Sequence, residues 1–264
     1  MADRNPWPDA GDRVPDPSGA VPGRAYTIAV WSARGGSGKT FLASSIALAE
    51  RERTDRRVLL VDLSLDFGGA EVFLDLHPER GVADLLPVLE ELEPSQFERA
   101  LTVHPTGLRV LCAGDRTGPA PSAAQVRALL RFCRAHHDLV FLDVPSALGE
   151  VTWAALTEAT AILYVLTPDL PGVQGLRRAV ARIEAERPAL LHRMGLAVNR
   201  SARGNQFGFP DIERLTGLPV LGQVRAAFWE LQGYLARSRL PLNPGGRLTP
   251  LLRDVVRLAT RLVG

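Results

Sequence analysis

WSARGGSGKT, residues 31–40, holds three glycines followed by a lysine and a threonine. The apolar run AYTIAVW (25–31) leads into it and predicts a buried strand, while TFLASSIALAE (40–50) has the apolar spacing of a helix. Glycines let successive backbone N–H groups turn toward one anion, and a helix adds the positive end of its dipole. A strand, a glycine-rich loop and a helix in this order predict a phosphate-binding loop.

The side chains at the end of this loop predict a nucleotide and a metal ion. Lys39 can reach the β- and γ-phosphates of a nucleoside triphosphate, and the Thr40 hydroxyl can ligate Mg²⁺. Lys39 is the single lysine among 31 Lys plus Arg, so arginine serves as the cation elsewhere in the chain. A planar guanidinium does not replace a compact ammonium in a narrow phosphate nest. Further nucleotide contacts are expected from Gly35, Gly36, Ser37, Gly38 and Phe41.

Beyond the loop, apolar runs alternate with segments of helical spacing. The predicted strands are 57–62, 107–113, 138–145, 159–168, 193–200 and 218–224. The predicted helices are 81–101 with a break at Pro94, 122–137, 150–159, 172–186, 226–237 and 249–263. Strands that are apolar throughout and separated by helices predict an α/β fold, with a mostly parallel sheet covered by helices on both faces. Such sheets bind ligands at the carboxyl ends of their strands, where the loop lies.

Residues 1–24 differ in composition from the rest of the chain. They hold five prolines and few apolar residues, so we expect a disordered leader before a single folded domain at 25–264. No apolar run has the length of a membrane span, and the first residues do not resemble a signal peptide. Cys112 and Cys133 are not a CxxC pair and favour a reducing compartment. We therefore expect a cytoplasmic protein.

Two predicted strands end in an aspartate. Asp62 closes the apolar part of VLLVDLSLDFGG (58–69), and Asp143 does the same in LVFLDVP (139–145). Mg²⁺ takes oxygen ligands, directly or through water, and nucleotide-hydrolysing proteins place such aspartates beside the phosphate loop. We expect Asp62 and Asp143 to hold the metal ion together with Thr40.

The loop departs from the general pattern GxxxxGK(S/T), because Ala33 stands where that pattern has its first glycine. It resembles the deviant Walker A form, KGGxGK(S/T), of the family that includes MinD, ParA and the nitrogenase iron protein. The resemblance implies a P-loop ATPase-like domain that binds ATP and Mg²⁺ and forms a homodimer when ATP is bound. In that family the leading lysine reaches across the dimer interface to the partner's phosphates. Arg34 stands at its position, keeps the positive charge and is expected to make the same contact.

The segment after Asp62 departs from the same family. Members usually read DxD there, and the second aspartate positions the attacking water, whereas this chain has Ser64. Serine is a poor base at neutral pH and carries no charge to orient water, so we expect a slow ATPase with impaired hydrolysis. Asp66, two residues further on, is the alternative candidate for positioning the water. The predicted catalytic residues are Lys39, Arg34, Asp62 and Asp66.

Several stretches resemble the CpaE/TadZ branch of this family, which helps to place the Flp (tight adherence) pilus machinery. They are VDLSLDFGGAEVFLDLHPERGVADLL (61–86), HPTGLRVLCAG (104–114), HHDLVFLDVPSALGEVTWAALTEA (136–159) and LTPDLPGVQGLRR (166–178). The branch implies a localisation or scaffold factor at the cell pole or the periphery of the inner membrane, with a protein partner in the pilus secretion machinery. The receiver-like domain common at the N-terminus of this branch has no counterpart in residues 1–24.

The strand end LAVNR (196–200) adds two candidate nucleotide contacts. Asn199 matches a family asparagine that hydrogen-bonds the edge of adenine, and Arg200 stands beside it. The segment GQVRAAF (222–228) lacks the Leu-Pro-x-Asp-like motif that usually follows the last strand near the base. The resemblance thus implies a contact with the base from Asn199, and Arg200 is a further candidate nucleotide contact.

Two other family roles stay open as alternatives: a MinD-like regulator of the division site that cycles on membranes, and a ParA-like DNA-partition ATPase. TPLLRDVVRLATRLVG (249–264) is amphipathic with an arginine once per turn, as in membrane-binding helices. We favour a last helix docked on the domain, with its arginines in solvent. Residues 225–264 carry seven Arg against one Asp and one Glu, a local balance of 7 − 2 = +5. Because no base-reading motif accompanies this charge, we do not expect a nucleic-acid partner.

Overall fold

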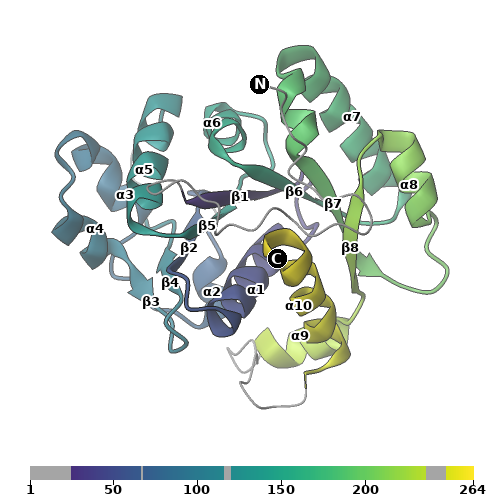
Figure 1. The fold of residues 1–264 in the computed structure, drawn as a ribbon, viewed down its shortest axis with the longest axis horizontal. Helices are drawn as coiled ribbons and strands as arrows, with labels where there is room; N and C mark the ends of the chain where they lie inside the picture. Colours follow the sequence, from purple (N-terminus) through teal and green to yellow (C-terminus); the bar gives the residue numbers. More distant parts are fainter. Residues whose placement is uncertain (1–24, 67, 116–119, 236–247) are drawn as a thin grey trace.

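The computed structural model describes residues 25–66, 68–115, 120–235 and 248–264. One eight-stranded sheet runs through them in the order β3-β4-β2-β5-β1-β6-β7-β8 (Figure 1). All neighbouring strands are parallel except β3 and β4. The strands are β1 (Tyr26–Trp31), β2 (Val58–Asp62), β3 (Thr102–Val103), β4 (Arg109–Leu111), β5 (Leu139–Asp143), β6 (Ala161–Leu166), β7 (Met194–Ser201) and β8 (Val220–Arg225). The predicted disorder of 1–24 falls outside the described residues.

Helices cover both faces of this sheet (Figure 1). One face carries α1 (Lys39–Arg53), α2 (Ala70–Leu74), α9 (Phe228–Leu235) and α10 (Pro250–Val263). The other carries α3 (Val82–Leu85), α4 (Pro94–Ala100), α5 (Ala123–His136), α6 (Glu150–Glu158), α7 (Leu170–Glu186) and α8 (Phe209–Thr216), with the 3-10 helices η2 (Leu86–Glu91) and η3 (Pro188–Arg193). The predicted α/β fold with a mostly parallel, doubly covered sheet is confirmed.

The central strands are largely apolar because each contributes to two cores. In β1, Ile28 and Val30 pack with α1 and α10, while Ala29 and Trp31 pack with the helices of the opposite face. Successive side chains of a strand point to opposite faces, so a strand buried on both sides is apolar at most positions before its end. The first polar side chains therefore gather at the carboxyl edge of the sheet.

Some short elements were not predicted from the sequence. β3 is a two-residue edge strand, antiparallel to β4, and β4 itself is shorter than the predicted run 107–113. α2 has five residues and α8 has eight, so neither shows the repeated apolar spacing of a longer helix. Helix α7 begins before the predicted residue 172, because Asp169 caps its first turn.

The C-terminal helix α10 packs on the sheet, as favoured from the sequence. Its apolar side chains are buried, whereas Arg253, Arg257 and Arg261 face solvent. Asp254 anchors the helix to the end of β8 by accepting hydrogen bonds from the Arg225 guanidinium at 2.6 and 2.9 Å. No helix within the described residues is long and apolar enough to cross a membrane.

Candidate functional site: a phosphate loop with two strand-end aspartates

The glycine-rich loop connects the carboxyl end of β1 to α1. Gly36 and Gly38 have φ angles of 72° and 95°, in the left-handed region that favours glycine. A Cβ on Gly38 would lie 2.2 Å from Nδ2 of Asn199, so only glycine fits there. Residues 33–36 are exposed and α1 starts at Lys39, which leaves the backbone N–H groups of the loop next to a helix N-terminus. This is the geometry that binds phosphate.

Asn199, at the end of β7, holds the loop through a hydrogen bond to its backbone. Its buried amide donates a hydrogen bond of 2.7 Å to the Ser37 carbonyl, and its Oδ1 accepts one of 2.9 Å from the Arg200 N–H. Arg200 has a φ of 57°, a conformation that this side-chain hydrogen bond helps to hold. The structure thus assigns Asn199 a supporting contact that was missed in the sequence, while its contact with adenine stays a prediction.

Lys39 and Thr40 both point toward the end of β5. The Lys39 ammonium donates to the Ser146 hydroxyl at 2.8 Å, and the Thr40 hydroxyl donates to Asp143 Oδ2 at 2.6 Å. Burial lowers the pKa of Lys39, and the negative charge of Asp143 opposes that shift. Ser146 had not been predicted, although it follows Asp143 closely in VPSALG (144–149). The loop and the β5 end therefore form one polar cluster.

Asp143 is completely buried, and only one of its oxygens has a protein partner. Oδ2 accepts the Thr40 hydroxyl, whereas Oδ1 has no hydrogen-bond partner in the described part of the chain. Burial raises the pKa of Asp143 to about 7, and the nearby Asp62 adds to this rise. A buried carboxylate oxygen without a partner is costly unless a cation or a donor meets it. Thr40 and Asp143 therefore fit a Mg²⁺ ion, which takes one or two protein oxygens together with nucleotide phosphates.

Asp62 lies opposite Asp143 in the register of β2 and β5, but its carboxylate is already occupied. Oδ1 accepts the Ser64 N–H at 2.9 Å, and Oδ2 accepts the N–H groups of Gly69 and Ala70 at 3.0 and 3.2 Å. These bonds fold the chain after β2 back onto the strand end. Asp62 stays a predicted metal ligand. Direct binding of an ion would compete with these three hydrogen bonds, whereas binding through water would not.

Asp66 is the alternative candidate for positioning the attacking water. It is exposed and lines a cavity of about 540 Å³ with Glu71, Asp84 and Asp115, and the described lining of that cavity includes neither Lys39 nor Asp143. The role of Asp66 in positioning water stays a prediction. Ser64 is half-buried beside Asp62.

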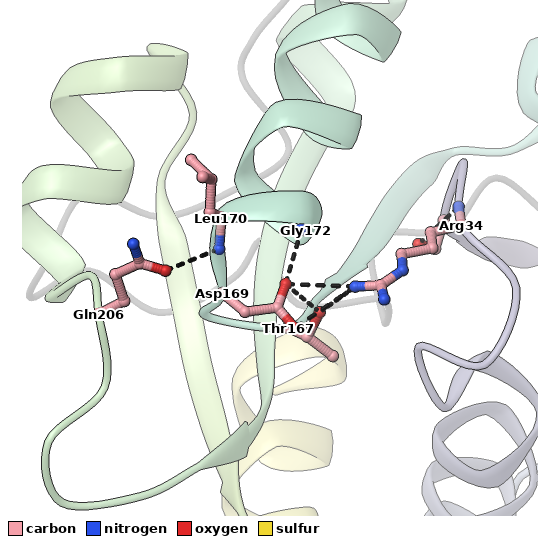
Figure 2. Close-up of polar contacts among 7 residues, drawn as sticks. Arg34, Thr167, Asp169, Leu170, Gly172 and Gln206 are labelled. Carbon is pink, nitrogen blue, oxygen red and sulfur yellow. Dashed lines mark hydrogen bonds and ion pairs between the residues drawn. The ribbon is translucent and has the colours of Figure 1, made fainter.

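Arg34 turns away from the loop toward the start of α7, as Figure 2 shows. Its Nη1 lies 3.2 Å from Asp169 Oδ1 and 3.5 Å from the Thr167 hydroxyl. Asp169 also caps α7, since its Oδ1 accepts the Gly172 N–H at 2.7 Å. In this structure Arg34 thus forms an ion pair within its own chain, and its contact with phosphate stays a prediction.

The geometry of the loop agrees with a match to a family model. Residues 28–228 match the CobQ/CobB/MinD/ParA nucleotide binding domain, from within β1 to the start of α9. The chain belongs to this family. The matched stretch contains the loop, both strand-end aspartates and Asn199.

Similar proteins are found along most of the chain. The septum site-determining protein MinD of Bacillus subtilis is 23% identical over 243 residues, which cover 87% of this chain and 87% of that protein. The crystal structure of a ParA family ATPase from Chlorobium tepidum superposes with a TM-score of 0.79 at 20% identity, over 90% of this chain and 98% of that one. MinD of Pyrococcus horikoshii in complex with Mg-ADP superposes with a TM-score of 0.71 at 16% identity, over 89% and 94% of the two chains. The CobQ/CobB/MinD/ParA fold of this chain is therefore established.

Proposed function

We propose that this chain binds Mg·ATP and works as a nucleotide-controlled, dimerising protein that hydrolyses ATP slowly. The observation that carries the proposal is the Thr40–Asp143 pair beside Lys39, the only lysine of the sequence. The buried Asp143 Oδ1 has no hydrogen-bond partner among the residues that the structure describes. The loop N–H groups and Lys39 would bind the phosphates. Thr40 and Asp143 would hold Mg²⁺, which neutralises phosphate charge when bound.

The hydrolysis step is the weakest part of the site. Ser64 offers a hydroxyl without charge, and Asp62 is occupied by backbone donors. Asp66 lines an exposed cavity whose described lining includes neither Lys39 nor Asp143. Positioning of water by a general base contributes about 10²–10⁴-fold to such reactions. We therefore expect a long-lived ATP-bound state. In that state the chain would form a dimer, and a protein partner would recognise the dimer.

For the biological role, we propose a localisation or scaffold factor of the CpaE/TadZ type in Flp pilus assembly. The support is the sequence of the segments 61–86 and 166–178, which surround Asp62 and Asp169. A MinD-like regulator is an equal second candidate, because the similarity to Bacillus subtilis MinD extends over 87% of the chain. The docked α10, with its apolar side buried, gives no advantage to the membrane-cycling variant of that role.

The first experiment measures phosphate release from Mg·ATP by the wild type and by Ser64→Asp. We expect a rate near background for the wild type and a gain of about ten-fold or more for Ser64→Asp, since an aspartate can orient water. Asp211→Asn, a change at the half-exposed first turn of α8, is a matched control for an added or removed charge. A wild type that already turns over rapidly would contradict the proposed impairment.

A second experiment separates the two biological roles. Sedimentation with anionic lipid vesicles in the presence of Mg·ATP compares the wild type with a triple variant in which Arg253, Arg257 and Arg261 are replaced by glutamine. Binding that the triple variant loses would favour the MinD-like role. We expect neither protein to bind, because the apolar side of α10 is packed on the sheet.

A further inference from the structure

Trp31, the last residue of β1, is hydrogen-bonded to the segment that follows β5. Its indole Nε1–H donates to the Pro145 carbonyl at 3.0 Å, and its side chain is completely buried. The ring packs edge-on against Tyr164, its register partner on β6, with the ring centres 5.3 Å apart and an angle of 86° between the planes. A buried ring that is packed in this way cannot turn freely, so the direction of its N–H group is fixed.

The same aromatic pair contacts the start of the glycine-rich loop. The Tyr164 hydroxyl accepts the Ala33 N–H at 3.2 Å. Ala33 stands where the general phosphate-loop pattern has its first glycine. The Trp31–Tyr164 pair therefore has hydrogen bonds to the loop on one side and to the segment after β5 on the other.

A second side chain, Thr152 in the first turn of α6, holds the same segment. Its hydroxyl lies 2.6 Å from the Ala147 carbonyl and 3.2 Å from the Pro145 carbonyl. A hydroxyl has one hydrogen to donate, and the shorter distance assigns that hydrogen to Ala147. Pro145 is then left mainly to the Trp31 N–H. The carbonyls on either side of Ser146 are thus each held by a different side chain.

Ser146 lies between these two carbonyls and contacts the lysine of the loop. Its hydroxyl accepts a hydrogen bond of 2.8 Å from the Lys39 ammonium. An ammonium group has three N–H donors, so two remain for phosphate oxygens while Ser146 holds the third. Ordering a long, flexible side chain on binding costs free energy, and a contact that already exists in the empty protein reduces this cost. The position of the Ser146 hydroxyl therefore helps to place Lys39 for phosphate.

We infer that Trp31 and Thr152 are positioning residues for the phosphate site, and that they act on Lys39 through Ser146. This inference rests on the proposed binding of Mg·ATP. Moving the Pro145 carbonyl away would leave the buried indole N–H of Trp31 without a partner, which is costly. The segment 145–147 is therefore kept in place in the empty protein, and Lys39 meets the nucleotide with its ammonium already oriented.

The test is a double-mutant cycle on the Kd for Mg·ATP. Fluorescent mant-ATP with Mg²⁺ is titrated into the wild type, Thr152→Val, Trp31→Phe and Ser146→Ala, and into the two double variants that contain Ser146→Ala. Valine lacks the hydroxyl of threonine, and phenylalanine keeps an aromatic ring without the N–H. We expect each single variant to bind about two- to ten-fold more weakly, the factor that corresponds to one hydrogen bond. In the Ser146→Ala background, neither other change should weaken binding further.

Stability measured on the same proteins separates positioning from a role in the core alone. Thr152→Val and Trp31→Phe also remove buried hydrogen bonds, and Trp31→Phe removes packed volume, so both should lower the melting temperature. These losses should be nearly the same with and without Ser146→Ala, because the core does not depend on the Ser146 hydroxyl. Only the loss of affinity should depend on it. Thr152→Val, the smaller change, tests the inference even where Trp31→Phe does not fold.

Trp153→Phe is the matched control, because Trp153 packs against the same core as Trp31 but its ring contacts the Arg187 guanidinium, 5.3 Å from the ring centre. It should leave the affinity unchanged. Unchanged affinity in any folded single variant of the cycle, or a loss that persists in the Ser146→Ala background, would overturn the inference while the proposed function stands. Absence of any Mg·ATP binding by the wild type would instead remove the proposed function, and this inference with it.

Discussion

Asp62 and Asp143 end neighbouring strands, face each other in register and are both buried, yet they are bonded in opposite ways. Asp62 accepts three backbone N–H groups from the segment that follows it. Asp143 accepts one hydroxyl and keeps one oxygen without a described partner. The comparison teaches that one carboxylate holds the polypeptide in shape, whereas the other is left available for a cation that the chain does not itself supply.

The largest expected effect follows from removing the structural carboxylate. Asp62→Ala should lower the free energy of unfolding by about 3–5 kcal/mol, because the half-buried Gly69 N–H and the buried Ala70 N–H lose a charged acceptor. Urea unfolding followed by circular dichroism measures this. Asp211→Ala, which removes a half-exposed cap of α8, should cost only about 1 kcal/mol. Equal losses in the two variants would remove the distinction drawn for Asp62.

At Asp143, on the neighbouring strand end, removing the charge is expected to raise the free energy of unfolding rather than lower it. Asp143→Asn should stabilise the nucleotide-free protein by about 1–3 kcal/mol, because it removes a buried charge while keeping an acceptor for the Thr40 hydroxyl. For a domain of this size the melting temperature should rise by about 2–4 °C per kcal/mol. Differential scanning calorimetry without nucleotide and Mg²⁺ measures the change. A clear loss of stability would mean that Asp143 is a structural residue like Asp62.

The stability gained in Asp143→Asn should depend on pH, which gives a further test of the comparison between Asp62 and Asp143. The folded protein raises the pKa of Asp143 to about 7 from a usual value near 3.8, so the folded state retains a proton that the unfolded state has lost. Below about pH 4 both states are protonated, and the advantage of Asp143→Asn should vanish. It should grow as the pH rises toward 7 and then stay constant. Unfolding of both proteins in urea at pH 4.5, 6 and 8 tests this, and a gain independent of pH would contradict the buried-charge explanation.

A smaller effect is expected from the loop support on β7. Asn199→Ala removes the hydrogen bond to the Ser37 carbonyl and should cost about 1 kcal/mol of stability. Because it loosens the loop rather than removing a phosphate contact, Mg·ATP should still bind, with a several-fold higher Kd. Isothermal titration calorimetry measures the Kd for Mg·ATP, with Asn205→Ala, a change in the adjacent exposed turn, as the control variant. Abolished binding would indicate a direct nucleotide contact.

The sequence allowed a good prediction of the elements that surround the loop. The apolar runs ending at Trp31, Asp62 and Asp143 were predicted as strands and are strands, because a parallel sheet covered on both faces leaves a continuous apolar signal. The position of Lys39 and Thr40 follows from the same signal, since the helix must begin where the glycines end. Long, regular elements with strong periodicity are the part of a fold that local sequence determines.

The contacts that give each polar residue its role were not predictable in this way. Asn199 meets Ser37 across 162 positions of the chain, and Arg34 meets Asp169 across 135. Asp62 and Asp143 have nearly identical local patterns, and only the path of the following segments separates them. Those paths depend on glycine conformations and on strand order, which are properties of the whole sheet.

The most direct test of the account is the Mg²⁺ dependence of ATP binding. Mant-ATP is titrated into the wild type and Asp143→Asn, each with Mg²⁺ and with EDTA. We predict that Mg²⁺ tightens binding to the wild type by at least about ten-fold and has little effect on Asp143→Asn. The expected site of the ion is Asp143 Oδ1, which has no partner among the described residues. Equal Mg²⁺ dependence in both proteins, or no ATP binding by the wild type, would contradict the assignment of this strand end as the cation site of a nucleotide-binding protein.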